Sequence, residues 1–289
     1  MMWYSARGSS RAYNIGLATS TDGISWSRYA ENPVLKTGPR GAWDSLSVRA
    51  PWVIYEGGVY KMWFEGQYRV WYVREHDAGR RGIGWRSEWS IVTSAIGYAT
   101  STDGIHWTKY SGNPVLTAGK TGRWDDGRIS DPVVVSSGSS YIMYYTGISR
   151  QGTTSRIGVA TSDDGIHWTK RDAPISIPIG SSGWDSYTRK LGGVTKVGNT
   201  YLMWYAGGSG PYQPLQIGFA ESTDGITWKA YPDNPVITHG NVGTWDGGGI
   251  FSPVVVAVGD KYYVYYIANQ VIRGYSIGVA ILPISQYSF

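Results

Sequence analysis

A near-copy of one hairpin sequence recurs five times along this chain of 289 residues. The copy at Ile96–Leu116 reads IGYATSTDGIHWTKYSGNPVL, and the copy at Ile15–Leu35 reads IGLATSTDGISWSRYAENPVL. The copies begin at Ile15, Ile96, Ile157, Ile217 and Ile277, at steps of 81, 61, 60 and 60 residues. Such regular repetition is typical of a chain that folds as a series of similar units, each stabilised by its neighbours.

A second module, which begins with Trp-Asp, precedes each of the later four copies. Each example holds an apolar run after Pro or Gly, a Gly-containing turn and an alternating aromatic run, which predicts an antiparallel hairpin. The four align without a gap: Trp43–Gly66, Trp124–Gly147, Trp184–Gly207 and Trp245–Ala268. The Asp-Gly pair of the first module predicts the turn of another hairpin. Four antiparallel strands, repeated radially, form a β-propeller blade.

We therefore predict an all-β, five-bladed β-propeller with four-stranded antiparallel blades, folded as a single domain over residues 1–289. The first blade lacks a segment for its innermost strand and the last lacks one for its outermost strand, so both are expected to be incomplete. Either the first blade is three-stranded or the sequence is truncated at its N-terminus, and the sequence does not separate these two alternatives. The predicted blades span about 1–36, 43–117 with an insertion at 67–95, 124–177, 184–238 and 245–289.

The composition excludes several classes of protein. The chain has no cysteine, which excludes disulfides and thiolate metal sites. No stretch is apolar for 18 residues, so we expect no membrane span. The N-terminus shows no signal peptide, and the localisation stays unknown, with secretion or the cell surface left open. The net charge of +5 is compatible with an acidic partner or an ordinary surface.

Residues repeated in every blade are expected to be structural, whereas departures from the repeat indicate function. The repeated turn carboxylates can accept hydrogen bonds from nearby backbone N–H groups. They are Asp22, Asp103, Asp164 and Asp224.

The strongest departure lies where the innermost strand of each blade begins, at the mouth of the central funnel. When the four Trp-Asp modules are aligned, the residue directly before the shared Pro or Gly is acidic in one module only, as Asp131. The residue one position earlier is Arg49 in the first module and Lys190 in the third. We predict that Asp131 acts in a polar site there, with Arg49 and Lys190 lining it. Glu65, an acid at the rim, is its candidate catalytic partner, and Arg128 and Asp126 are candidate substrate contacts.

The insertion at 67–95 is the largest departure. It interleaves arginines with aromatic side chains, among them Trp71 and Trp85. Aromatic faces stack on sugar rings and arginine binds carboxylate or phosphate, so we predict that both tryptophans contact substrate. The insertion is expected to fold over the funnel mouth, the alternative being a self-packed flap.

These motifs resemble the five-bladed propeller glycoside hydrolases, the superfamily of arabinanases, xylosidases and arabinofuranosidases (family 43) and of invertases and levansucrases (family 32). The likeness rests on the S-x-D-G-x-x-W…N-P-V-L hairpins, on RAPWVIYEGGVYKMWF and on SDPVVV at 130–135. It implies a glycoside hydrolase acting on a poly- or oligosaccharide, with arabinan or xylan favoured. It also implies that Asp131 holds the sugar and tunes the acid.

Two departures from the superfamily bear on catalysis. The innermost strand of the first blade, which carries the base or nucleophile, has no counterpart here. Lys190 stands where the superfamily has its general acid. Since glycoside hydrolysis ordinarily needs two carboxylates, a non-catalytic glycan-binding propeller is the alternative.

The expected partner is a carbohydrate. No organic cofactor and no metal site are predicted; a cation on the propeller axis is left open without a ligand cluster to support it. Nucleic acid binding through the arginines of the insertion ranks last, because Glu and Asp lie between them. The oligomeric state is not indicated by the sequence.

Overall fold

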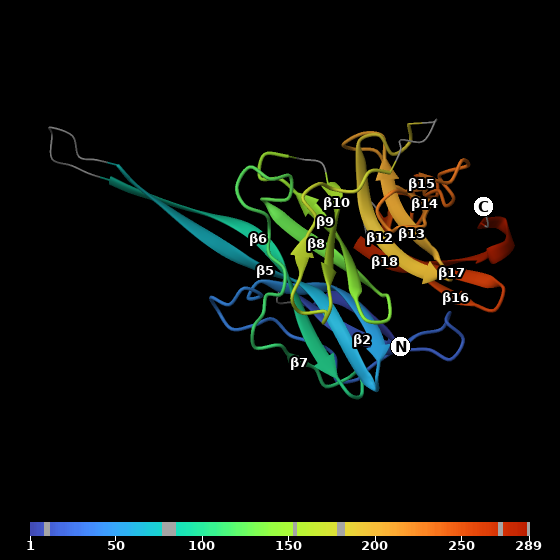
Figure 1. The fold of residues 1–289 in the computed structure, drawn as a ribbon, viewed down its shortest axis with the longest axis horizontal. Helices are drawn as coiled ribbons and strands as arrows, with labels where there is room; N and C mark the ends of the chain where they lie inside the picture. Colours follow the sequence, from blue (N-terminus) through green and yellow to red (C-terminus); the bar gives the residue numbers. More distant parts are fainter. Residues whose placement is uncertain (9–11, 77–84, 153–154, 178–182, 271–273, 288–289) are drawn as a thin grey trace.

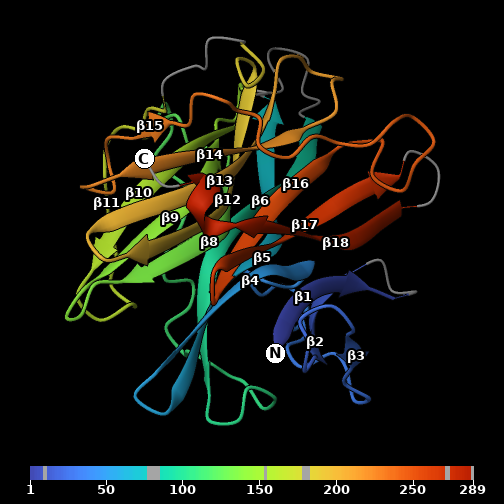
Figure 2. The ribbon, with the colours of Figure 1, turned by 90° about the vertical axis from the view of Figure 1, so that its right-hand side faces the viewer.

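The computed structural model describes residues 1–8, 12–76, 85–152, 155–177, 183–270 and 274–287, with the backbone alone at 72–76, 85–89 and 286–287. Five small antiparallel sheets are arranged around a central axis as a five-bladed β-propeller (Figures 1 and 2). Blades 2, 3 and 4 have four strands, whereas blades 1 and 5 have three in the described residues. The predicted fold, including its incomplete first and last blades, is confirmed.

The strands of each blade follow one another from the axis outward. Blade 1 holds β1 (Met2–Arg7), β2 (Tyr13–Thr19) and β3 (Ser27–Arg28). Blade 2 holds β4 (Ser47–Glu56), β5 (Val59–His76), β6 (Trp85–Ser101) and β7 (Thr108–Lys109). Blade 3 holds β8 (Arg128–Ser136), β9 (Tyr141–Ile148), β10 (Ser155–Ser162) and β11 (Thr169–Lys170). Blade 4 holds β12 (Thr188–Val197), β13 (Thr200–Gly208), β14 (Gln216–Ser222) and β15 (Lys229–Ala230). Blade 5 holds β16 (Ile250–Val258), β17 (Lys261–Gln270) and β18 (Gly274–Pro283), and a short 3-10 helix, η2 (Ile284–Tyr287), follows.

Two repeated sequence motifs, the Asp-Gly turn and the Asn-Pro pair, are explained by local hydrogen bonds. In the Asp-Gly turn, the Asp103 carboxylate accepts the N–H groups of Ile105 and His106 at 2.8 Å each. The His106 ring Nδ1 also lies 2.6 Å from the Asp103 carboxylate, and this side-chain hydrogen bond contributes most to holding the pKa of the Asp103 carboxyl well below its usual value, followed by the two backbone bonds. In the Asn-Pro motif, the Asn113 side-chain amide accepts a hydrogen bond from the Tyr98 N–H at 2.8 Å and donates one to the Tyr98 carbonyl at 2.9 Å. Both motifs are therefore structural, as predicted for the aspartates of the turns.

The glycine of the Ile-Gly pair at the start of each copy is explained by a close contact with an aromatic ring. The Tyr145 ring of β9 lies over Gly158 of β10, where an added Cβ would come within 2.3 Å of the ring. The same contact joins Tyr4 to Gly16 in blade 1, at 2.9 Å. A side chain larger than hydrogen would displace the buried ring, so the glycine is required for packing.

Neighbouring blades are joined by one recurrent hydrogen bond. A ring N–H or hydroxyl on the second strand of one blade donates to the glycine carbonyl in the Asp-Gly turn of the next. The bonds are Trp3 to Gly104 (2.9 Å), Trp63 to Gly165 (2.8 Å), Tyr144 to Gly225 (3.0 Å) and Tyr265 to Gly23 (2.8 Å). The last of them joins blade 5 to blade 1 and closes the ring.

The described parts of the insertion, 67–76 and 85–95, do not fold over the funnel, which corrects the expectation from the sequence; residues 77–84 lie outside the described residues. Instead, β5 and β6 continue past the blade as a paired two-stranded arm, in register from Tyr68 opposite Thr93 to His76 opposite Trp85. The arm projects away from the propeller body (Figure 1). Strand pairing continues because both segments are rich in β-branched and aromatic residues, with no Pro or Gly to break the ladder before residue 79. No helix among the described residues is long and apolar enough to cross a membrane.

Glu56, at the end of β4, joins blades 2 and 3 on the side opposite the arm. Its carboxylate accepts hydrogen bonds from Lys61 (2.7 Å), from Ser136 (3.0 Å) and from the Tyr141 hydroxyl. Because these bonds stabilise the ionised form, they lower the pKa of Glu56 to about 2, the bond from Lys61 contributing most.

We predict that Glu56→Gln lowers the melting temperature at pH 7 and flattens its acid dependence. A lowered folded-state pKa gives stability that is present above the unfolded value of 4.5 and is lost as the pH falls from there toward 2. Thermal unfolding followed by circular dichroism between pH 7 and pH 2 measures both effects. The exposed Glu31→Gln is the matched control. Parallel melting curves for the wild type and Glu56→Gln over that range would contradict the prediction.

Candidate functional site

The start of each innermost strand carries a bulge that aims one side chain out of the ladder. The register between β8 and β9 shifts between Ser130 and Val133, and Asp131 adopts a left-handed backbone with φ of 51°. Ala50 and Ser252 take the same conformation in blades 2 and 5, with φ of 48° and 51°. The bulge is thus part of the repeated scaffold, and only blade 3 uses it to present a carboxylate. Bulges often re-aim side chains in this way beside active sites.

Arg49 and Glu65 form a two-point ion pair across β4 and β5. The guanidinium donates from Nε to Oε2 and from Nη2 to Oε1, both at 2.9 Å. Gln67 donates a further hydrogen bond to Glu65 at 3.1 Å. The Glu65 side chain is 1% exposed, so both of its oxygens are held by protein groups. The second predicted carboxylate is therefore engaged rather than free.

Asp131 lies within electrostatic range of this pair. It is partly exposed and accepts a hydrogen bond from the Ser130 hydroxyl at 2.8 Å. Burial raises the pKa of Glu65, Arg49 opposes that rise, and the negative charge of Asp131 adds to it. The structure thus pairs Arg49 with Glu65 and places Asp131 close enough to interact electrostatically with both.

The opposite part of the mouth is cationic and aromatic. The Lys190 ammonium, at the start of β12, lies 6.0 Å from the centroid of the Phe251 ring at the start of β16. Phe251 in turn makes an edge contact with Tyr275, the two ring centroids being 5.9 Å apart. Tyr275 is 63% exposed, so its ring is open to a ligand. Tyr275 was not among the predicted site residues; it lies near the start of β18, within the segment that the sequence alone assigned to the loop between the second and third strands.

The remaining predicted residues fall into separate places. Arg128 is exposed at the start of β8. Asp126 is 6% exposed and accepts the N–H groups of Gly122 and Arg150 at 2.8 Å each, which lowers its pKa and ties two loops together. Trp71 is 65% exposed on the arm. The side chain of Trp85 lies outside the described residues.

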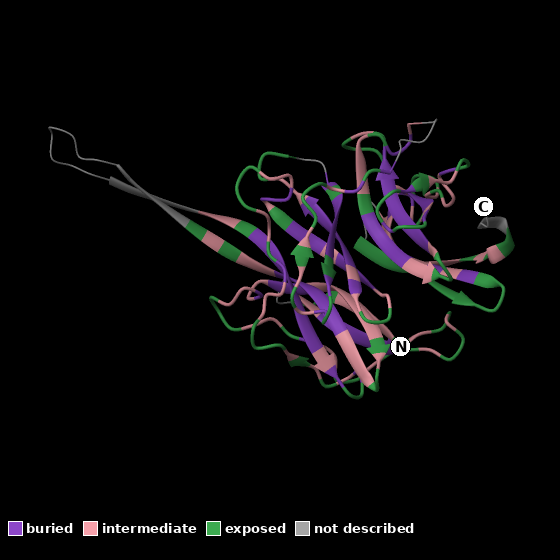
Figure 3. Cartoon of the chain, viewed as in Figure 1, coloured by how far each residue is buried: buried purple, intermediate pink, exposed green. Residues whose placement is uncertain are grey.

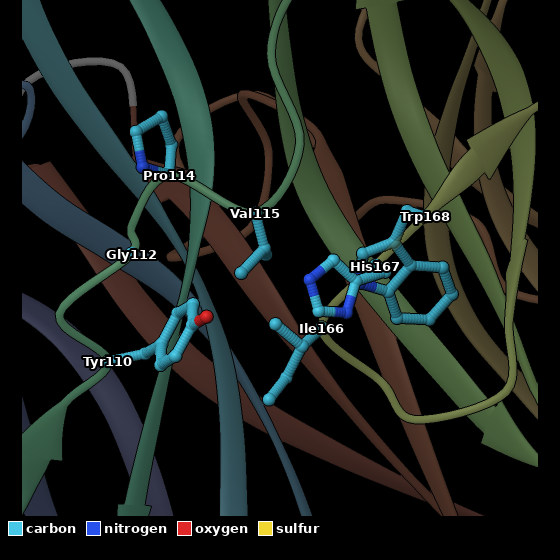
Figure 4. A pocket seen from close by; sticks show the side chains of 7 residues that line it. All are labelled: Tyr110, Gly112, Pro114, Val115, Ile166, His167 and Trp168. Carbon is cyan, nitrogen blue, oxygen red and sulfur yellow. The ribbon is translucent and has the colours of Figure 1, made fainter.

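A hollow of about 330 Å³ lies between blades 2 and 3, and none of the predicted site residues lines it (Figure 4). Its lining comes from the segment that follows β7 in blade 2 and from the Asp-Gly turn of blade 3: Tyr110, Gly112, Pro114, Val115, Ile166, His167 and Trp168. Most of these positions belong to the hairpin sequence that is repeated from blade to blade, so we assign the hollow to the structural scaffold. Among the described residues, no three His, Cys, Asp or Glu side chains are grouped so as to hold a metal ion.

Comparison with known proteins gives a partial family match. The model of the glycosyl hydrolases family 32 N-terminal domain matches residues 84–178. The uncharacterized protein Rv1502 of Mycobacterium tuberculosis (strain ATCC 25618 / H37Rv) is 30% identical over 172 residues, which are 60% of this chain and 49% of that protein. The chain thus spans about half the length of the first curated relatives that it matches. The 1,2-beta-oligomannan phosphorylase of Thermoanaerobacter sp. (strain X514) is 24% identical, over 92% of this chain and 79% of that protein.

Solved structures share the fold at low identity. A glycoside hydrolase superposes with a TM-score of 0.69 and 17% identity, covering 94% of this chain and 78% of its own. The beta-1,2-mannobiose phosphorylase of Listeria innocua, in complex with beta-1,2-mannobiose, gives 0.65 and 16%, covering 89% and 78%. This chain therefore shares its propeller fold with these carbohydrate-active enzymes, and the family 32 model matches part of it. The resemblance seen in the sequence is confirmed at that level, but the matches do not single out family 43.

Proposed function

We propose that this propeller is a carbohydrate-active enzyme that cleaves a mannoside by phosphorolysis, with Asp131 as the general acid. One curated relative that matches 92% of this chain is named a 1,2-beta-oligomannan phosphorylase, and one solved structure that covers 89% of it is named a beta-1,2-mannobiose phosphorylase. They favour a mannoside over the arabinan or xylan that the sequence alone suggested.

The observation that carries the proposal is the unequal state of the two carboxylates. Hydrolysis ordinarily needs two, one as acid and one to activate water or attack the sugar. Glu65 is buried and held at both oxygens by Arg49, whereas Asp131 is partly exposed. Phosphate is itself a nucleophile and needs no base, so a single carboxylic acid is sufficient for phosphorolysis.

The charges around the mouth support this chemistry. Lys190 and Arg128 are exposed cations at the start of neighbouring innermost strands, and both ammonium and guanidinium groups bind phosphate well. Phe251 and Tyr275 offer ring faces on which a sugar can stack. In this arrangement Asp131 protonates the leaving oxygen while the cations hold the phosphate that attacks the anomeric carbon.

The test is incubation with beta-1,2-mannobiose in the presence and absence of inorganic phosphate, with products followed by NMR. We expect a mannose 1-phosphate and free mannose, formed only when phosphate is present. Release of two mannose molecules without phosphate would show hydrolysis and contradict the proposal.

A non-catalytic glycan-binding protein is the second candidate, favoured by the Arg49–Glu65 clamp. In that case calorimetry would detect mannobiose binding, while neither product appeared with or without phosphate.

A further inference from the structure

The loop between β13 and β14 carries an almost completely exposed tyrosine. Tyr212 is 95% exposed, whereas the strands on either side of the loop are largely buried (Figure 3). The loop leaves β13 at Gly208, which lies opposite Thr188 at the start of the innermost strand of blade 4. Because the innermost strands begin at the mouth of the funnel, this loop lies on the mouth side of the propeller.

Two prolines restrict the backbone around this tyrosine. Pro211 and Pro214 flank Tyr212 and Gln213 in the sequence, and a proline ring fixes its own φ angle at about −65°. The Gln213 N–H donates to the Gly210 carbonyl at 3.4 Å, which closes a turn with proline at its second position and the tyrosine at its third. A loop restrained in this way loses little conformational entropy when a ligand binds to it.

A run of glycines in blade 5 anchors the loop. Blade 5 has three consecutive glycines, Gly247–Gly249, at positions where blades 2, 3 and 4 have at most one. At Gly249, with φ of 112°, an added Cβ would come within 2.8 Å of the backbone nitrogen of Leu215. The Ile250 N–H donates to the Leu215 carbonyl at 2.9 Å. The glycine therefore admits the loop of blade 4 against the start of β16.

The sector of the mouth where the loop is anchored is aromatic. Phe251 follows Ile250 on β16, and its ring meets the exposed ring of Tyr275 edge to face. The loop of Tyr212 is bonded to the residue beside Phe251, so a third aromatic residue belongs to the same sector. A single exposed aromatic side chain on a surface is ordinary. A restrained one on a loop anchored beside an aromatic pair matches the composition of a ligand site.

We propose that Tyr212 is the platform of an outer sugar subsite, which makes this protein selective for oligosaccharides longer than a disaccharide. The inference rests on the proposed function, because it takes the Asp131 site as the place where the sugar chain is cleaved. A sugar ring can stack on the exposed aromatic face of Tyr212. Gln213, also exposed, has an amide that can donate to and accept from sugar hydroxyls. A unit bound there adds affinity to a long chain and none to a disaccharide.

The test compares beta-1,2-mannobiose with beta-1,2-linked mannotetraose, by initial rates of phosphorolysis and by calorimetric binding without phosphate. We expect kcat/KM and affinity of the wild type to be at least tenfold higher for the tetraose. Tyr212→Ala should lower both tetraose values at least tenfold and leave the mannobiose values and the melting temperature unchanged. Tyr212→Phe keeps the ring and should retain the preference. Tyr55→Ala is the matched control, since Tyr55 is 62% exposed at the far end of β4.

The rate and binding measurements separate failure of the subsite from failure of the proposed function. Equal values for the two sugars in the wild type, or a tetraose preference that Tyr212→Ala leaves unchanged, would overturn the subsite while phosphorolysis stood. Tetraose binding that depends on Tyr212, without any turnover, would keep the subsite and overturn phosphorolysis. No binding and no turnover of either sugar at millimolar concentration would overturn both.

Discussion

Replacement of Arg49 by methionine is expected to lower the free energy of unfolding by about 3 kcal/mol, the lower end of the range for breaking a buried ion pair. The variant leaves the Glu65 carboxylate buried without its two guanidinium donors. The lower end applies because the Arg49 side chain is 34% exposed, so water can enter once it is shortened. Against a total stability of roughly 5–15 kcal/mol, this is a large loss. Methionine keeps the aliphatic length of arginine, which isolates the charge from the packing.

Urea unfolding followed by tryptophan fluorescence measures this effect, and a double variant identifies its cause. Arg49→Met with Glu65→Leu removes both charges, so it should recover most of the lost stability. Arg123→Met is the matched control, since its partner Asp172 is 93% exposed and such surface pairs contribute about 0–1 kcal/mol. If Arg49→Met proved no more harmful than Arg123→Met, Glu65 would not depend on the guanidinium.

The propeller could be predicted because its repeat units specify themselves locally. Each Asp-Gly turn accepts its own backbone N–H groups, and Asn113 pairs with Tyr98 fifteen positions before it. Glycine at position 158 admits the ring of Tyr145. These contacts lie within one blade, so the spacing of residue types in the sequence is enough to indicate them.

The site was only partly predictable, because its decisive contact crosses between two strands. Arg49 and Glu65 were each recognised as a departure from the repeat, yet their pairing depends on register, which places them directly opposite each other. The hairpin alignment contained this information, since a cation and an acid at facing positions of one blade are expected to pair. The arm could not be placed in the same way. A long insertion between paired strands can close over a face or extend the ladder, and the outcome depends on side-chain packing that the repeat does not encode.

Asp131→Asn is expected to reduce turnover by about 10²–10⁴-fold, the usual contribution of general acid catalysis. Asparagine keeps the shape of the side chain but has no acidic proton to give to the leaving oxygen. Its backbone tolerates the left-handed conformation with φ of 51°, so the melting temperature should change little. Initial rates of mannose 1-phosphate formation, with thermal unfolding of the same samples, measure both quantities.

A control substitution at another aspartate distinguishes the loss of the general acid from the loss of a negative charge elsewhere on the propeller. Asp260, exposed in the turn between β16 and β17, lies at the opposite end of the blade, so Asp260→Asn should leave rate and stability unchanged. Full activity of Asp131→Asn would remove Asp131 from the chemistry, and Glu65 could replace it only by releasing Arg49. Because that release carries the stability cost predicted for Arg49→Met, a catalytic Glu65 would make Arg49→Met alter the rate as well as the stability. The two substitutions together therefore decide which of the two carboxylates acts as the acid.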